Sequence, residues 1–227
     1  MSSRASSARP VTHVLFDLDG VLLDTEGLYT AATASVLARF GISFDPALKS
    51  RLMGRDALVS ARIVIDALGV PLSPEDLVRE RRPRLEALLA ESPPREGAES
   101  FVRALRSAGA PAAVATSSER ALYELKSGRH AWFDLFAAVV CGDDPRVRAR
   151  KPAPDIFLVA AAALGAPPSG CLVVEDSPAG AEAAIAAGMR VVVLADPSLG
   201  PADFPPVDRL VRSFDDLDAK DLLSRGP

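Results

Sequence analysis

The sequence predicts a doubly wound α/β protein, in which a parallel sheet carries helices on both faces and an all-helical segment is inserted. Five short apolar runs, rich in Val and without polar alternation, indicate strands that are buried on both faces. These runs are residues 11–16, 112–115, 136–141, 171–174 and 191–194. Helical patterns lie between them, as in a parallel sheet. The first two runs are separated by far more chain than one crossover helix requires.

The long segment after the first run has helical periodicity of its own. Two apolar faces recur at helical spacing: Leu28, Ala32, Val36 and Phe40, then Leu58, Ala61, Ile65 and Leu68. A third helix is expected to begin with Ser73 as its N-cap and Pro74 in its first turn. Its apolar stripe runs through Leu77, Leu85 and Leu88. We expect Pro83 to kink or divide this helix.

The ends of the helical segment indicate hinges. Polar residues, Pro and Gly gather at residues 24–26 and 91–97, and such composition is typical of boundaries between compact units. We therefore expect an α/β core of residues 11–27 and 92–227. The intervening residues 28–91 are expected to form a helical cap with a small core of their own.

Two helices of the core carry clear boundary signals. The Ala- and Leu-rich stretch 153–164 is followed by Gly165, a favourable residue just past the end of a helix. The next helix is expected to have Ser177 as N-cap, Pro178 in its first position and Gly188 after its end.

Composition and charge exclude several classes of partner. A formal net charge of −4 over 227 residues gives no general attraction to nucleic acid or to an anionic membrane. No apolar run approaches the roughly 20 residues that cross a bilayer, and the N-terminus lacks the apolar region of a secretory signal. Cys141 and Cys171 sit at the edges of strand-like runs, which indicates buried thiols in a reducing compartment. We expect a cytoplasmic protein without a nucleic-acid or membrane partner.

Chemistry-bearing residues follow four of the apolar runs. In an open parallel sheet, ligands bind beyond the carboxyl ends of the strands, so residues at those ends are expected to meet. In chain order they are Asp17 and Asp19, Thr116 and Ser117, Lys151, and Glu175 and Asp176.

This combination of side chains favours phosphoryl transfer. Asp17 and Asp176 offer the oxygen ligands that Mg²⁺ prefers, and the ion would neutralise carboxylates that otherwise repel one another. Lys151 adds a positive charge for a phosphate group. The Thr116 hydroxyl and backbone N–H groups near Ser117 can hold phosphate oxygens.

Two of the carboxylates are expected to take part in the reaction itself. Asp17 is ionised at neutral pH near its reference pKa of about 4, so it can attack phosphorus directly. Asp19 is expected to point back toward the site, where it can protonate the leaving alkoxide. The same carboxylate can then deprotonate the water that breaks the acyl phosphate.

These motifs resemble those of the haloacid dehalogenase superfamily, in its phosphatase branch. The first motif is similar to "DLDGVLLDTE", the second to "TSS", the third to "KP" and the fourth to "EDS". The resemblance covers nearly all of the chain, and residues 28–91 are similar to the helical type-one cap of that family. It implies a Rossmann-like core and a Mg²⁺-dependent enzyme, which is expected to be a monomer at this size.

Carried over residue by residue, the resemblance implies a role for each motif position. Asp17 is the nucleophile, and Asp19 is the acid/base, with a backbone carbonyl that also reaches the metal. The remaining positions are Thr116 and Lys151 for phosphate, Asp176 for Mg²⁺, and Glu175 for orienting metal-bound water.

Further stretches are similar to one subgroup of the superfamily. They are "LMGRDALVSARIVID", "KSGRH", "CGDDPRV" and "KPAPDIFL". The subgroup holds eukaryotic pseudouridine-5′-phosphatase and plant-type glycerol-phosphate phosphatases, and these stretches do not separate the two. The expected substrate is a small phosphorylated metabolite. Pseudouridine 5′-phosphate is our first choice, with glycerol 3-phosphate or a 2-deoxysugar phosphate as the alternative.

Three other activities are compatible with the scaffold. A sugar phosphomutase of the β-phosphoglucomutase type would return the phosphoryl group to another hydroxyl, and the subgroup resemblance argues against it. A dehalogenase has no alkoxide to protonate and needs no acid at Asp19. A non-catalytic phosphate-binding protein would be expected to lack Asp17 or Asp19, and both are present.

The residues that read the leaving group are left open by the sequence. Glu26 is a candidate, and Arg55 in "MGRD" either faces the site or belongs to a turn between two cap helices. The basic trio Lys126, Arg129 and His130 either lines the cleft or solvates the surface. We retain Arg129 as a substrate candidate and favour a structural role for the trio.

Overall fold

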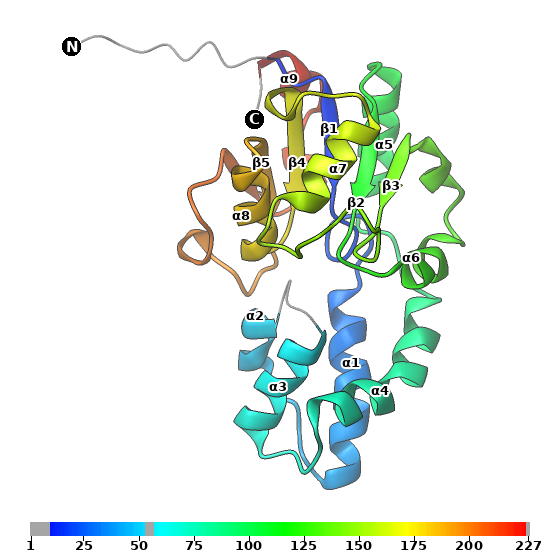
Figure 1. The fold of residues 1–227 in the computed structure, drawn as a ribbon, viewed down its shortest axis with the longest axis vertical. Helices are drawn as coiled ribbons and strands as arrows, with labels where there is room; N and C mark the ends of the chain where they lie inside the picture. The colour runs from blue at the N-terminus through cyan, green and yellow to red at the C-terminus, as the bar shows by residue number, and fades with distance from the viewer. Residues whose placement is uncertain (1–9, 53–56, 226–227) are drawn as a thin grey trace, which may run out of the picture.

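The computed structural model describes residues 10–52 and 57–225, and it has the predicted α/β fold. Six parallel strands form one sheet in the order β3-β2-β1-β4-β5-β6 (Figure 1). The strands are β1 (His13–Phe16), β2 (Ala112–Ala115), β3 (Ala138–Val140), β4 (Cys171–Glu175), β5 (Arg190–Leu194) and β6 (Arg209–Val211). The first five coincide with the five predicted runs, although β4 and β5 each extend one residue beyond theirs. The sixth was not predicted, because this edge strand has only three residues and is partly exposed.

Helices cover both faces of the sheet because successive strand residues point to opposite sides. Val14 and Phe16 of β1 belong to an apolar cluster with α5 (Ala98–Ser107) and α9 (Ala219–Arg225). Leu15 points the other way, into a cluster with α7 (Asp155–Ala163) and α8 (Pro178–Ala186). This double covering explains the continuous apolar runs and confirms the fold class.

The predicted helix boundaries in the core are confirmed. Ser177 is the N-cap of α8, and its hydroxyl accepts from the Gly180 N–H at 3.0 Å. Gly165 and Gly188 follow α7 and α8 with φ of 67° and 72°, the left-handed conformation that glycine adopts without strain. A further helix, α6 (Arg120–Ser127), follows β2.

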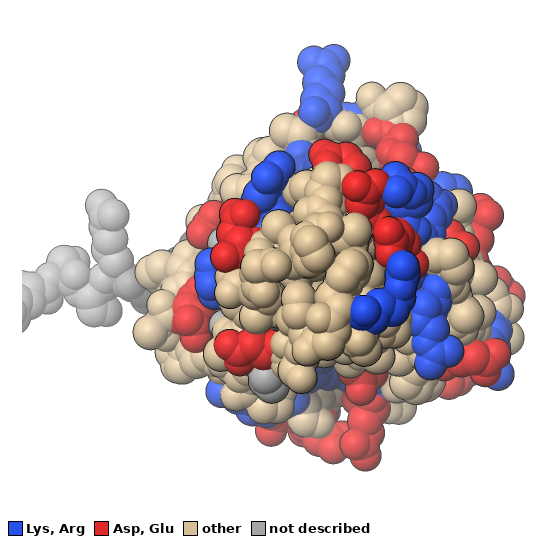
Figure 2. Space-filling view, turned by 90° about the horizontal axis from the view of Figure 1, so that it is seen from below, with Lys and Arg blue, Asp and Glu red and all other residues tan. Residues whose placement is uncertain are grey.

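Of the α-helices described between β1 and β2, the first four lie beyond the carboxyl ends of the strands (Figure 1). They are α1 (Glu26–Leu37), α2 (Lys49–Leu52), α3 (Ala57–Leu68) and α4 (Pro74–Leu89). Their apolar faces form a separate cluster of Val36, Leu37, Ala61, Val64, Val70 and Leu77. Figure 2 views the molecule from this end, where acidic and basic side chains are interspersed around uncharged surface. We retain residues 28–91 as the proposed cap.

The exposures of Phe40 and Leu58 differ from the sequence predictions, and of the two outcomes expected at Pro83 the structure excludes division of the helix. Phe40 is 37% exposed, because α1 ends at Leu37 and a 3₁₀ turn carries Phe40 off its apolar face. Leu58 is 44% exposed, since it lies in the first turn of α3 and the buried face begins at Ala61. Pro83 lies inside α4 without dividing it. Packing of α4 against α1 and α3 offsets the single hydrogen bond that proline removes.

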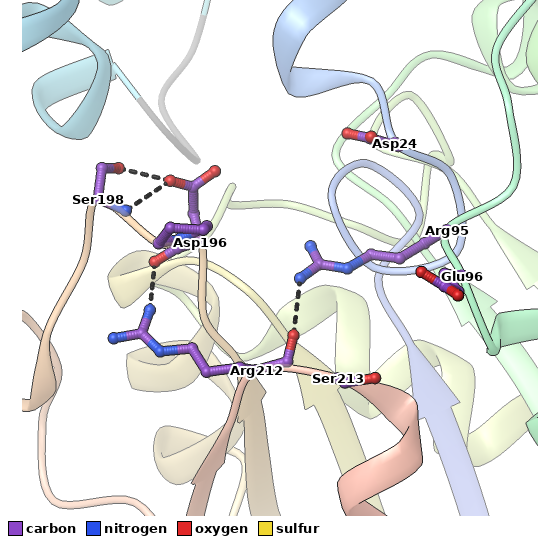
Figure 3. A pocket seen from close by; sticks show the side chains of 8 residues that line it. Asp24, Arg95, Glu96, Asp196, Ser198, Arg212 and Ser213 are labelled. Carbon is purple, nitrogen blue, oxygen red and sulfur yellow. Dashed lines mark hydrogen bonds between the residues drawn. The ribbon is translucent and has the colours of Figure 1, made fainter.

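The two connections between core and cap run side by side. Leu23 forms an antiparallel bridge with Pro94, and the Arg95 N–H donates to the Leu22 carbonyl at 2.9 Å. The Arg95 guanidinium donates to the Gly20 carbonyl at 2.5 Å. Figure 3 shows the same side chain reaching the backbone carbonyl of Arg212, the residue after β6; both residues line a surface pocket of about 600 Å³. Backbone pairing therefore holds the predicted hinges together.

The predictions of buried thiols and of no membrane-spanning segment can be compared with the structure. Cys141 and Cys171 are buried free thiols, and burial raises the pKa of each to about 11. Within residues 10–52 and 57–225, no helix combines the length and the apolar composition of a membrane span.

Candidate active site

Three neighbouring strands deliver polar side chains to one edge of the sheet. Asp17 follows β1, and its N–H donates to the Val174 carbonyl of β4 at 3.0 Å. Thr116 follows β2, with its N–H bonded to the Val140 carbonyl of β3 at 3.0 Å. Asp176 follows β4, which pairs with β1 on the other side. The strand order reverses at β1, and ligands of open α/β sheets bind at such a point.

Lys151 reaches the same edge from the loop before α7. Its Nζ lies 2.6 Å from Asp17 Oδ1 and 2.5 Å from Glu175 Oε1, and it also donates to the Ala115 carbonyl at 3.3 Å. The side chain is only 4% exposed, and the ammonium lies 4.8 Å from the centre of the Phe157 ring. Three segments far apart in sequence therefore converge on one ammonium group.

Glu175 is anchored at the start of α8. Its Oε2 accepts from the N–H groups of Asp176 and Ser177 at 2.8 and 2.9 Å, and from the Ser177 hydroxyl at 3.0 Å. A Cβ at Gly180 would overlap the Glu175 carboxylate, so this position has room only for glycine. The positive end of the helix dipole at the start of α8 favours the negative charge of the Glu175 carboxylate.

The carboxylates of the site have shifted pKa values. Burial raises the pKa of Asp17 to about 7, although the Lys151 charge opposes the shift. Burial, and then repulsion from neighbouring carboxylates led by Glu175, raises the pKa of Asp176 well above its usual range. Burial alone would lower the pKa of Lys151, but Asp17 and Glu175 outweigh burial and raise it. One ammonium therefore does not balance three buried carboxylates.

The donor set fits Mg²⁺. No three His, Cys, Asp or Glu side chains in the described part of the chain are grouped so as to hold a metal by themselves. Mg²⁺ commonly takes one or two protein carboxylates and completes its octahedral shell with water and phosphate oxygens. Asp17 and Asp176 would supply two such oxygen ligands, and a cation beside them would favour their charged forms against the burial and repulsion that raise their pKa.

Asp19 has a different set of partners. Lys126 Nζ lies 2.7 and 2.6 Å from the two carboxylate oxygens of Asp19 and 2.7 Å from Ser118 Oγ. The Thr25 and Ser118 hydroxyls donate to Asp19 at 2.8 and 2.9 Å. Burial would raise the pKa of Asp19, but the charge of Lys126 and these hydrogen bonds together lower it.

Sequence reasoning missed this role of Lys126. We grouped it with Arg129 and His130 and favoured a structural role, but its side chain is 0% exposed and directed at Asp19. A signal was present in the sequence: Lys126 lies three residues after Tyr123, on the buried face of α6. A lysine on the apolar face of an amphipathic helix needs a partner.

A cavity of about 340 Å³ joins the core residues to the cap. Its core side includes the predicted residues Asp17, Asp19, Thr116, Ser117, Lys151, Glu175 and Asp176. Cap side chains form the opposite wall, among them Tyr29, Thr33, Phe44, Leu52 and Arg81. Glu26, at the start of α1, also lines the cavity, so the structure brings this predicted candidate to the site.

The other candidate for substrate contact that lies in the described residues, Arg129, is not found there. Arg129 is exposed on the core, where it pairs with Glu91 and does not line the cavity. His130 Nε2 lies 2.9 Å from the Ser92 carbonyl in the same connection. Arg55 lies outside the described residues.

Arg81 of α4 was not singled out by the sequence. The residue is 8% exposed, its Nη1 donates to the Thr33 hydroxyl at 3.3 Å, and its buried Nε has no partner within the described residues. Burial lowers the pKa of the guanidinium from a value far above neutrality. Four arginines lie between residues 79 and 84, so composition alone could not identify the buried one.

Comparison with known proteins agrees with the motifs. A family model described as haloacid dehalogenase-like hydrolase matches residues 11–188. The chain is 45% identical to a "probable pseudouridine-5′-phosphatase" of Drosophila melanogaster over 195 residues, which cover 84% of each chain. It is 41% identical to a "(DL)-glycerol-3-phosphatase 2" of Arabidopsis thaliana, over 91% of this chain and 89% of the other. The resemblance to this subgroup is confirmed.

Solved structures share the fold. A hydrolase from Deinococcus radiodurans, solved with bound phosphate and sodium, superposes with a TM-score of 0.78 at 30% sequence identity. The match covers 94% of this chain and 96% of the other. That protein is described as a HAD family hydrolase, and HAD stands for the haloacid dehalogenase family that the motifs indicate.

Proposed function

Because this chain belongs to the haloacid dehalogenase-like hydrolase family and is a phosphatase of small phosphate esters, we propose that it is a Mg²⁺-dependent phosphomonoesterase that forms an aspartyl phosphate on Asp17. The observation that carries this proposal is the convergence of Asp17, Lys151 and Asp176 on one cavity. Separate strands and loops supply these groups, and their chemistry matches the needs of a phosphoryl group.

The first half of the reaction is transfer to Asp17. A carboxylate oxygen attacks phosphorus, and the bond from phosphorus to the leaving oxygen breaks. Lys151 and the Thr116 hydroxyl hold the phosphate oxygens during transfer. Asp19 takes up a proton when the negatively charged phosphate binds beside it, which opposes the lowered pKa of the free site, and it donates this proton to the leaving oxygen so that an alcohol departs.

The second half returns the enzyme to its starting state. Asp19, now a carboxylate, accepts a proton from water as that water attacks phosphorus. The acyl phosphate bond breaks, which releases inorganic phosphate and the Asp17 carboxylate. Glu175 keeps Lys151 in place throughout, because one of its oxygens is paired with the ammonium and the other is bonded to the start of α8.

Asp17, Asp176 and the backbone carbonyl of Asp19 would hold the metal. When bound, Mg²⁺ supplies neutralisation of the carboxylates and stabilisation of charge on the phosphate. The raised pKa values of Asp17 and Asp176 support this assignment, since a second positive charge is needed to keep both groups ionised at neutral pH.

Gly20 offers a test of the proposed role of Asp176. Gly20 has a φ of +76°, and a Cβ there would overlap the Asp176 carboxylate; Gly41 has a φ of +70° with nothing within 4 Å. We expect Gly20→Ala and Gly41→Ala each to lose about 1 kcal/mol of unfolding free energy from backbone strain. Only Gly20→Ala is expected to lower kcat, by roughly 10-fold or more, because it displaces Asp176.

Urea unfolding and phosphate release measured on both variants will compare these effects. Equal kcat for the two variants would show that the position of Asp176 does not matter for turnover.

The cavity favours a leaving group that has apolar faces and hydrogen-bond acceptors. Phe44 and Leu52 provide apolar wall, while the Arg81 fork offers donors whose burial leaves them short of partners. A volume of about 340 Å³ is within the usual range for a small-molecule pocket. We propose pseudouridine 5′-phosphate, whose ring has flat faces and carbonyl oxygens. Glycerol 3-phosphate is the alternative, and it would fill less of this space.

A substrate panel tests the activity and the leaving group together. Pseudouridine 5′-phosphate, uridine 5′-phosphate, glycerol 3-phosphate and 2-deoxysugar phosphates are compared by kcat/KM for phosphate release in Mg²⁺. A preference for glycerol 3-phosphate would select the alternative, and no release from any of them would overturn the hydrolase proposal. Glucose 1-phosphate is added, because its conversion to glucose 6-phosphate would indicate a phosphomutase.

Replacing Arg81 is expected to affect leaving groups that accept hydrogen bonds. For Arg81→Met we expect kcat/KM on the preferred substrate to fall about 10- to 100-fold, the usual effect of removing a specific polar contact. Methyl phosphate, which has no acceptor beyond its phosphate, is expected to change less than about 3-fold. Arg79→Met is the matched control, since Arg79 is largely exposed in the same helix, is paired with Asp76 and does not line the cavity. An equal loss on both substrates would contradict a contact between Arg81 and the leaving group.

A further inference from the structure

Lys126 lies outside the four motifs but directly beside the proposed acid/base. We propose that Lys126 is a positioning residue that, together with the Ser118 hydroxyl, fixes the carboxylate of Asp19 for proton transfer. This inference rests on the proposed function, because it concerns how Asp19 performs its step.

The hydrogen bonds of the Lys126 ammonium all go to Asp19 and to Ser118, whose hydroxyl is itself bonded to Asp19. An ammonium has three N–H donors, and the three partners of Lys126 are the two Asp19 oxygens and Ser118 Oγ, all within 2.7 Å. Lys126 therefore differs from Lys151, which contacts the proposed nucleophile.

Burial shows that this lysine has a specific use. Fully buried lysines are rare, because removing the ammonium from water is costly unless it is paired and hydrogen-bonded. Lys126 is 0% exposed, whereas the Asp19 side chain is 19% exposed and lines the cavity. The lysine is thus shielded from solvent, while the carboxylate of Asp19 remains accessible from the cavity, where a substrate would bind.

Three separate elements hold this one carboxylate. Thr25 precedes α1, Ser118 follows β2, and Lys126 lies in α6. Their donors reach both oxygens of Asp19, which leaves its side chain little freedom to rotate. Proton transfer requires the acid to be aligned with the leaving oxygen, and small misplacements lower the rate strongly. Fixing this carboxylate is therefore a contribution to the chemical step.

The proposal predicts a loss that depends on the leaving group. An alkoxide needs a proton as it departs, whereas p-nitrophenolate is stable without one, so only alkyl phosphates depend on an aligned acid for transfer to Asp17. We expect Lys126→Met to slow alcohol release from the best alkyl phosphate about 100-fold in single-turnover experiments. Release of p-nitrophenol from p-nitrophenyl phosphate is expected to change less than about 3-fold. Lys220→Met, at an exposed position in α9, is the matched control and should change neither rate.

The same experiment can overturn the proposal. An equal loss on both substrates would show that Lys126 only maintains the structure, and no loss on either would show that Asp19 does not need it. Both results assume a wild-type enzyme that releases phosphate; if it releases none, the proposed function fails instead.

A double-variant comparison makes the test independent of overall damage. If Lys126 acts through Asp19, adding Lys126→Met to Asp19→Asn will cause no further loss on the alkyl phosphate. Multiplicative losses would contradict the proposal. Should Lys126→Met fail to fold, Ser118→Ala removes one hydroxyl of the same set and is expected to give the same selective loss, at roughly 10-fold. Equal losses on the two substrates in that variant would also overturn the proposal.

Discussion

Asp17→Asn is expected to lower kcat by at least about 10⁴-fold while the protein still folds. The amide of asparagine is a poor nucleophile and carries no charge, so no acyl phosphate can form. Folding should persist because Lys151 keeps its contact with Glu175 when Asp17 is replaced. Phosphate release and circular dichroism measure the two outcomes. Activity above about 1% of wild type would exclude Asp17 as the nucleophile.

The same variant has an expected pH signature in its stability. The folded-state pKa of Asp17 is raised to about 7 from an ordinary value of 3.8, so the folded protein holds this proton more tightly than the unfolded chain. The resulting stabilisation is fully present below the ordinary pKa and is lost as the pH rises through about 7. Asparagine cannot ionise, so without divalent metal we expect Asp17→Asn to melt at or above wild type at pH 8. A clearly lower Tm at pH 8 would contradict the origin we give for the shift.

Asp176→Asn is expected to remove the response of the protein to Mg²⁺. For the wild type, Mg²⁺ at about 100 times its Kd should raise Tm by roughly 5 to 10 °C, because the ion binds only the folded state. The variant should lose this increase, and its kcat should fall roughly 100-fold or more. Without metal it should be at least as stable as wild type, since it lacks one of the repelling carboxylates.

Melting curves with EDTA and with Mg²⁺ distinguish this result from a general loss of stability. Asp66→Asn is the matched control, because Asp66 is exposed in α3 and lies outside the cavity. It should keep the full increase in Tm. A full increase in Asp176→Asn would show that the ion is held by other residues.

Much of the core site could be predicted from the sequence, for a physical reason. Parallel strands buried on both faces are continuous apolar runs, and their carboxyl ends share one edge of the sheet. The residues after each run, such as Asp17, Thr116 and Asp176, therefore had to lie close together. Lys151 could be added because its loop starts a helix that packs beside the same strands.

Other parts depended on packing that no local pattern encodes. Whether Lys126 faces solvent or Asp19 depends on the rotation of α6 against the sheet, and the charged neighbours of Lys126 suggested solvent. Arg81 is one of several arginines in α4, and it is buried in the packed cap, where its Nη1 contacts Thr33 of α1. Leu58 was assigned to a buried face because periodicity cannot show how far from its start a helix is covered.

The paired connections at Leu23 and Pro94 have a consequence for how this architecture can diversify. The chain leaves the sheet and returns to it at points joined by a hydrogen bond between Leu22 and Arg95. A module whose two ends are adjacent can be lengthened or exchanged without altering the strands from which it departs. The helical segment that contacts the leaving group can therefore change in evolution, and with it the metabolite that is recognised, while the core residues that break the phosphate ester stay the same.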